Sequence, residues 1–151
     1  VTAHFHYTLM GAALTGAVAG LVYWFPKMSG RMLNERASFY SFLLVQLGFQ
    51  VLYLGMFIAG AEGQPRRVAD FAAQYRTSNM ISTGGAYAIG LGFIILLWAV
   101  VHSWRHGEVA PMNPWGAKTL EWTVPYPVPL VNFDTPPVVT SDPYGYGKAQ
   151  K

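Results

Sequence analysis

The sequence contains no cysteine and few charged residues, and these two absences narrow the class of protein. Only 11% of the 151 residues are charged, against about 25% in ordinary soluble domains. Without cysteine, this chain can form no disulfide, thiolate ligand or iron–sulfur cluster, so any metal must be held by histidine or oxygen. Hydrophobic residues reach 52% and aromatic residues 15%. This composition is typical of a membrane protein.

Three apolar runs are long enough to cross a hydrocarbon core of about 30 Å, which takes about 20 residues. They cover residues 7–25, 37–61 and 78–104, and only His102 among them can carry a charge. We therefore expect an all-α membrane protein with three transmembrane helices, at about 1–25, 37–61 and 78–104, forming part of a larger helical bundle. Small residues recur in the first and third runs, where they let helix backbones approach closely or leave room beside a bulky cofactor.

The remaining segment, 105–151, has a different composition. Seven of the ten prolines lie between Pro111 and Pro137, and no further apolar run follows. Proline-rich sequence favours extended backbone without internal hydrogen bonds. We expect residues 1–104 to form the transmembrane part and residues 105–151 to form an extended tail that packs over it.

The loops predict the orientation, because Lys and Arg concentrate in the short cytoplasmic connections of membrane proteins. The connection after the first run carries Lys27, Arg31 and Arg36, and Arg105 follows the third run. Both would lie on the cytoplasmic or matrix side, together with the tail. The amino end and the second connection would then lie on the outer side.

Two histidines, His4 and His6, stand at the mouth of the first run. At about 100° of rotation per residue they point roughly 200° apart on a helix, so they cannot chelate one ion. If both are ligands, they hold two different metal centres on either side of one helix. Phe5 lies between them. The alternative is a pair of interfacial or hydrogen-bonded side chains.

The outer connection departs from the charge rule, since it contains Arg66, Arg67 and Arg76. Adjacent arginines hold carboxylates well, and a haem carries two propionates. Arg66 and Arg67 are therefore candidate partners of an anionic cofactor. A solvated turn or a contact with lipid headgroups is the alternative.

The chain opens on Val1 with no initiator Met and no basic segment before the apolar run. No secretory signal is therefore expected, and the start has the character of an interior one. We expect the chain to be processed or to be a piece of a longer protein.

Taken together, these segments resemble the last three membrane helices and the tail of the large catalytic subunit, subunit I, of haem-copper oxidases. The resemblance covers nearly the whole chain and keeps the family's order and spacing. The motifs that carry it are His-Phe-His at 4–6, Trp-Phe-Pro-Lys-Met-Ser-Gly at 24–30, Pro-Arg-Arg at 65–67, Pro-Trp-Gly at 114–116 and Leu-Glu-Trp-Thr at 120–123.

The resemblance implies roles for the site residues. His4 would be the proximal ligand of the high-spin haem that faces copper, and His6 an axial ligand of the low-spin haem. Arg66 and Arg67 would interact with haem propionates, and Phe5 would pack between the two macrocycles or contact lipid or core. The copper ligands would lie outside this chain, because His102 and His106 stand at the opposite end of the third run.

The resemblance also implies an activity and partners. The complete protein would reduce dioxygen to water and couple this to proton pumping, with cytochrome c or a quinol as electron donor. It would need the remaining helices of the core, other oxidase subunits and a lipid membrane, either the bacterial plasma membrane or the mitochondrial inner membrane, and no nucleic acid. A relative of nitric oxide reductase and a noncatalytic haem-binding or assembly module are the alternatives.

Overall fold

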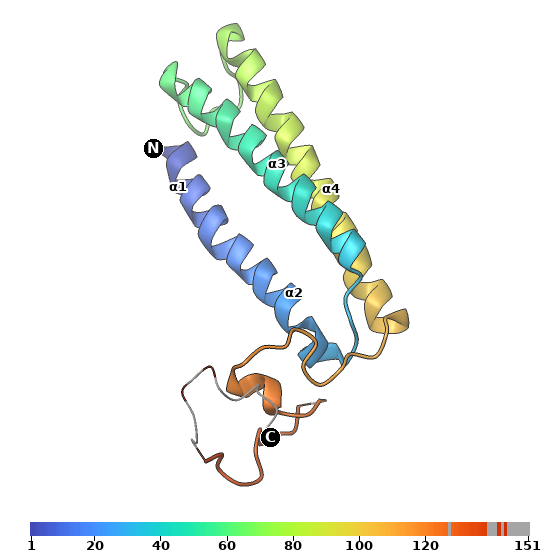
Figure 1. Ribbon diagram of the computed structural model, residues 1–151. Helices are drawn as coiled ribbons and strands as arrows, with labels where there is room; N and C mark the ends of the chain where they lie inside the picture. Colours follow the sequence, from blue (N-terminus) through green and yellow to red (C-terminus); the bar gives the residue numbers. More distant parts are fainter. Residues whose placement is uncertain (127, 139–141, 143, 145–151) are drawn as a thin grey trace.

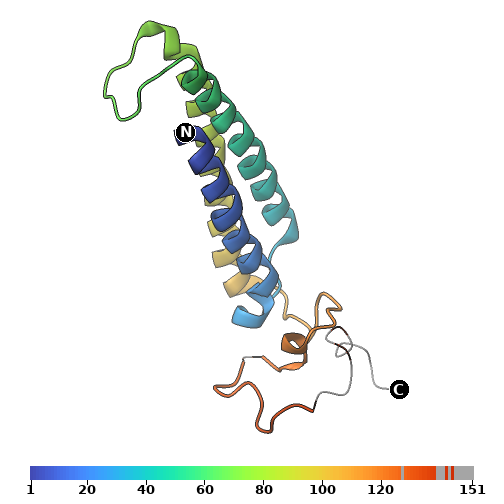
Figure 2. The same ribbon diagram turned by 90° about the vertical axis from the view of Figure 1, so that its left-hand side faces the viewer.

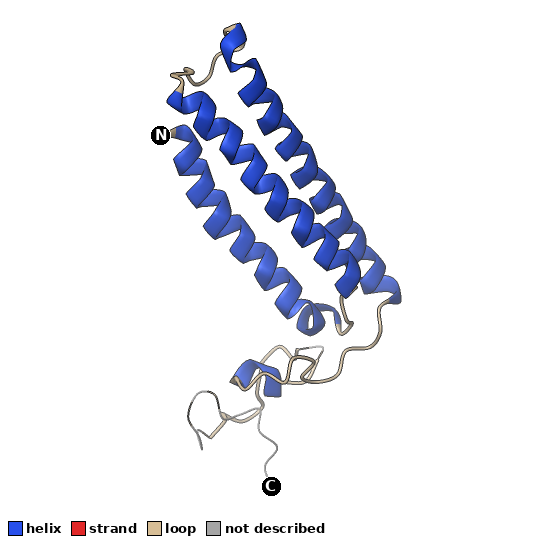
Figure 3. Cartoon of the chain, turned by 45° about the horizontal axis from the view of Figure 1, so that its top comes forward, coloured by secondary structure: helices blue, strands red, loops and turns tan. Residues whose placement is uncertain are grey.

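Three helices, each long and apolar enough to cross a membrane, run side by side (Figures 1 and 2). They span Thr2–Ser29, Glu35–Ala61 and Ala73–His106 in the computed structural model, which describes residues 1–126, 128–138, 142 and 144. The predicted all-α membrane fold is confirmed, since the described residues form helices and loops and contain no strand (Figure 3).

The first helix consists of α1 (Thr2–Leu9), a π-helical turn η1 (Met10–Leu14) and α2 (Thr15–Ser29). The helix continues four residues beyond the first apolar run and contains Pro26 in its last turn. It ends where Gly30 adopts φ 71° and donates its N–H to the Pro26 carbonyl at 2.8 Å. A left-handed glycine is a common helix C-cap, because glycine has no Cβ to strain that conformation.

The second helix, α3 (Glu35–Ala61), begins at a side-chain cap. The Asn34 side-chain oxygen accepts the Ala37 N–H at 3.0 Å, which satisfies one of the free N–H groups of the first turn. The Asn34 N–H itself donates to the Ser103 hydroxyl at 2.9 Å. This bond ties the start of α3 to the end of α4 (Arg76–His106), which follows a short 3-10 turn, η2 (Ala73–Tyr75).

Glycines bring α3 and α4 into close backbone contact. A Cβ added to Gly85 would lie 2.7 Å from the Gly48 carbonyl oxygen and closer still to the backbone of Leu52. Two hydroxyls bond across the same interface, because Ser41 donates to the Gly92 carbonyl at 2.8 Å and Ser82 donates to the Leu52 carbonyl at 3.0 Å. Small residues and interhelical hydrogen bonds are the usual basis of helix association in membranes.

The segment after α4 folds back against the carboxyl-terminal end of α2. The Trp122 indole, in η3 (Leu120–Thr123), is 2% exposed and donates to the Tyr23 hydroxyl at 3.0 Å. The Lys27 ammonium donates to the Val124 carbonyl and lies 5.4 Å from the centre of the Trp122 ring. A cation over an aromatic face is attracted to its π electrons. Described residues of the tail thus cover one end of the first helix.

The division of the chain into residues 1–104 and 105–151 stays a prediction, as does the cytoplasmic or matrix location of the tail. Of the predicted tail, residues 127, 139–141, 143 and 145–151 lie outside the described residues.

The contact between α3 and α4 predicts different effects for two neighbouring glycines. Gly85→Ala should lower the unfolding temperature, because its methyl group meets the backbone of α3 and overpacking costs about 1–3 kcal/mol. Gly84→Ala is the matched control, since a Cβ at Gly84 has open space around it within this chain. Thermal unfolding of the detergent-solubilised protein, followed by far-ultraviolet circular dichroism, measures both. Equal unfolding temperatures in the two variants would contradict the proposed close approach.

Candidate functional site

The rotation of the first helix is fixed by the face that packs on α3. Ala3 is buried, and the Tyr7 ring lies 4.8 Å from the Phe49 ring and 5.4 Å from the Tyr53 ring, centre to centre. The Tyr7 hydroxyl also donates to the Gln50 side chain at 3.3 Å. Tyr7 therefore marks the direction in which α1 faces the rest of the molecule.

His4 and His6 lie on either side of this packed face. At 100° per residue, His4 is about 60° to one side of Tyr7 and His6 about 100° to the other. Both histidines are exposed within this chain. The helix thus presents two separate imidazoles in different directions, and neither is taken up by packing on α3 or α4.

The His6 ring has a hydrogen bond that defines its free nitrogen. Its Nδ1 lies 3.0 Å from the Thr2 carbonyl oxygen. When Nδ1 carries the proton and donates to that carbonyl, Nε2 has a free lone pair and points away from the backbone contact. This is the arrangement that a metal-ligating histidine needs.

Phe5 lies opposite the packed face of α1. It is 55% exposed, and its ring stands edge-on to the His6 ring at 5.2 Å. Its direction is about 100° from each histidine. Phe5 therefore separates the two imidazoles on the side of α1 that faces away from α3.

Arg66 and Arg67 lie close to the start of the first helix. They line a cavity of about 610 Å³ together with Val1, Thr2 and Ala3 and with the last turns of α3. No ion pair to either guanidinium occurs in the part of the chain that the structure describes. The structure thus brings the two arginines to the end of the molecule that carries His4 and His6, where they can attract an anion.

The backbone at Arg67 is in the left-handed region, with φ 60°. A residue with a side chain adopts this conformation at a cost of about 1–3 kcal/mol, and such residues cluster at functional sites. This conformation could not be predicted from the sequence, because no local pattern distinguishes Arg67 from Arg66.

The structure does not bring His102 and His106 to this site. Both lie near the end of α4, and α4 alone is about 46 Å long at 1.5 Å per residue. No group of three or more His, Asp or Glu side chains in the described residues is placed to hold a metal ion. A copper site with three histidines therefore cannot be built from them.

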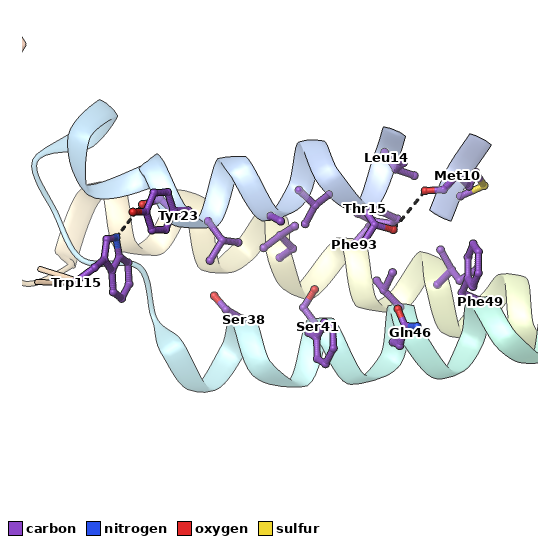
Figure 4. Close-up of a pocket in the computed structure, with 17 residues that line it drawn as sticks. Met10, Leu14, Thr15, Tyr23, Ser38, Ser41, Gln46, Phe49, Phe93 and Trp115 are labelled. Carbon is purple, nitrogen blue, oxygen red and sulfur yellow. Dashed lines mark hydrogen bonds between the residues drawn. The ribbon is translucent and has the colours of Figure 1, made fainter. Parts of the chain in front are cut away.

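A cavity of about 510 Å³ between the first helix and the pair α3 and α4 was not predicted from the sequence (Figure 4). Its walls are apolar, with Met10 and Phe49 at one end and Tyr23 and Trp115 at the other. The π-helical turn at Met10–Leu14 borders it, and the Thr15 hydroxyl donates to the Met10 carbonyl there at 3.3 Å. Small residues in this part of the first run were the only sequence signal.

Known proteins are similar to this chain over nearly its whole length. Residues 1–88 match the family described as Cytochrome C and Quinol oxidase polypeptide I. Cytochrome c oxidase subunit 1 of Thermostichus vulcanus is 44% identical over 147 residues, covering 97% of this chain and 27% of that protein. The subunit 1 of Corynebacterium diphtheriae is 40% identical over 146 residues, covering 94% of this chain and 26% of that protein.

Cytochrome c oxidase subunit 1 of a Synechocystis strain is 37% identical over 147 residues, again covering 97% of this chain and 27% of the relative. The chain therefore spans about a quarter of the length of these relatives. Together with its three apolar helices, these matches identify an integral membrane protein that belongs to the cytochrome c and quinol oxidase polypeptide I family.

Proposed function

We propose that this chain is part of the catalytic subunit of a terminal respiratory oxidase that reduces dioxygen to water with coupled proton pumping. His4 serves as an axial ligand of the high-spin haem iron and His6 as an axial ligand of the low-spin haem iron. The observation that carries the proposal is the exposure of these two imidazoles on opposite sides of the face that packs on α3. The name of the relatives, cytochrome c oxidase subunit 1, favours oxygen reduction over nitric oxide reduction or a noncatalytic role.

The residues fit two separate haems, and they do not fit a shared metal ion. Imidazoles that diverge from one helix reach irons on different sides of it. The hydrogen bond from His6 to Thr2 fixes the ring and leaves Nε2 available. The haems supply the electron transfer and oxygen chemistry when bound, while His4 and His6 hold and orient them and tune them through ligand basicity.

Phe5 acts as a spacer in this arrangement. Its ring projects from α1 between the directions of the two histidines and contacts the His6 ring. A rigid aromatic side chain at this position keeps two flat cofactors apart and excludes water between them. Phe5 is thus a positioning residue.

Arg66 and Arg67 compensate the propionate charges in this proposal. Their cavity opens beside Val1–Ala3, one turn or less from both histidines along the chain. Two guanidinium groups without an ion-pair partner in the described residues favour carboxylate ligands, which they bind in a bidentate manner. Their positive charge would stabilise both the bound propionates and the reduced state of a nearby haem, so haem affinity and haem potential would both depend on these arginines.

Only part of the oxidase is built from this chain. The copper centre in the same core takes its ligands from residues outside it, as the remaining helices of the core complete the bundle. The proposed partners are those helices, other oxidase subunits, and cytochrome c or a quinol as electron donor. The proposed location is the bacterial plasma membrane or the mitochondrial inner membrane.

A spectrum of the complex that contains this chain tests the function directly. A reduced-minus-oxidised difference spectrum, recorded with and without carbon monoxide, should show two haems of which only one binds carbon monoxide. That result is expected because the high-spin iron keeps an open coordination position and the low-spin iron does not. A single haem, or none, would refute the proposal.

Substitution of each histidine should remove a different spectral component. His6→Ala should abolish the low-spin haem signal, and His4→Ala should weaken the high-spin signal and its carbon monoxide complex. His102→Ala is the matched control, because that histidine lies at the far end of α4 and should leave both signals intact. Loss of the same component in the His4 and His6 variants would contradict the assignment to opposite sides of the helix.

Arg66→Ala and Arg67→Ala should each lower a haem reduction potential by an amount on the order of tens of millivolts. The reason is that removing a positive charge disfavours the addition of an electron. A spectroelectrochemical titration of the complex measures the potentials. Arg76→Ala provides the control, since Arg76 is not among the residues that line the same cavity. Unchanged potentials in both variants would instead support a contact with lipid or solvent.

A further inference from the structure

The far end of α4 carries two histidines that the proposed oxidase chemistry does not use. His102 and His106 are four residues apart, so they project from the same face of the helix in its last turns. Both are exposed, and neither makes a hydrogen bond among the described residues. Their ring nitrogens are thus available to a ligand.

We propose that His102 and His106 form a binding site for a divalent transition-metal ion, and that Zn²⁺ is the ion it takes. Imidazole nitrogen is a preferred zinc ligand, and the chain offers no thiolate that would compete for the ion. The site is distinct from the haem ligands, because it lies at the opposite end of the bundle from the amino terminus (Figure 1).

The spacing of the two rings fits chelation. Their centres are 5.2 Å apart, with an angle of 30° between the ring planes. A tetrahedral Zn²⁺ bound to two imidazoles at about 2.0–2.1 Å places the ring centres about 5 Å apart. The separation of the two ring centres is therefore compatible with one nitrogen of each ring binding a common ion.

One of the rings is held in place by its neighbour. The Trp98 and His102 rings stack at 4.9 Å with an angle of 10° between them. Stacking restricts the rotation of the His102 ring, which lowers the entropy lost when the metal binds. It also leaves the edge of the imidazole, where the nitrogens lie, free.

The cavity beside the pair contains both carboxylates and guanidinium groups. His102 and His106 line it together with Glu35, Glu108 and Arg36, and the Arg31 guanidinium donates to the Gly107 carbonyl at 2.6 Å. A backbone hydrogen bond joins two residues that line this cavity, because the Met32 N–H donates to the Glu108 carbonyl at 2.8 Å. In the described residues no third side chain stands ready as a ligand. Water, or a carboxylate after a change of rotamer, would complete the coordination.

Zinc binding to the purified complex that contains this chain tests the site. After treatment with a chelator, equilibrium dialysis against Zn²⁺ should show one bound ion that is lost, or bound at least about tenfold more weakly, in both His102→Ala and His106→Ala. Arg105→Ala is the matched control, because it changes the same exposed turn without touching the pair.

Two results would overturn the proposal: zinc binding that neither histidine substitution changes, and a loss confined to one of the two variants, which would exclude chelation. Haem spectra of the variants report whether the complex is intact. A second measurement needs no variant. Zn²⁺ should protect both His102 and His106 of the unmodified complex from carbethoxylation, as detected by mass spectrometry, and the absence of protection would equally refute the site.

Discussion

The packing of Tyr7 against α3 is the contact on which the candidate site depends. A helix that crosses a membrane can rotate about its own axis unless a side chain fixes it, and in this chain the aromatic cluster around Phe49 and Tyr53 provides the fixed point. The Tyr53 hydroxyl adds a contact to the Met10 sulfur at 3.2 Å. Once this face is fixed, the directions of both histidines follow from helix geometry alone.

The position of the residues around Tyr7 depends in turn on α3, and α3 is held in place by its packing against α4. The glycines at 48 and 85 let the two backbones meet, and the hydroxyl of Ser41 closes a hydrogen bond that lipid cannot supply. The pair α3 and α4 therefore acts as a rigid platform on which the first helix rests. At the tail end the first helix has a second support, since Phe25 packs with Leu33 and Ala99. The apolar cavity lies between the two supports (Figure 4).

The sequence was sufficient for the class of fold and for the relation between the histidines. Apolar runs of the required length predict membrane helices because the bilayer sets the length, and the divergence of His4 and His6 follows from the helical period. The placement of Arg66 and Arg67 beside the start of the first helix required the structure, because loop conformation depends on contacts far apart in the chain. The end of the first helix also required the structure, since an apolar run that stops at Phe25 cannot indicate that the helix continues through Pro26 to Ser29. The roles of these residues toward haem remain proposals.

The π-helical turn at Met10–Leu14 divides the first helix into two parts whose packed faces are offset from each other. A π turn accommodates an additional residue in the helix, so the half before it is rotated relative to an uninterrupted α-helix. The amino-terminal half is oriented by Tyr7 and presents the histidines, whereas the other half is oriented by Phe25 and Tyr23 against the helices and the tail. The offset thus lets one continuous helix turn Tyr7 toward Phe49 at its start and Phe25 toward Ala99 at its end.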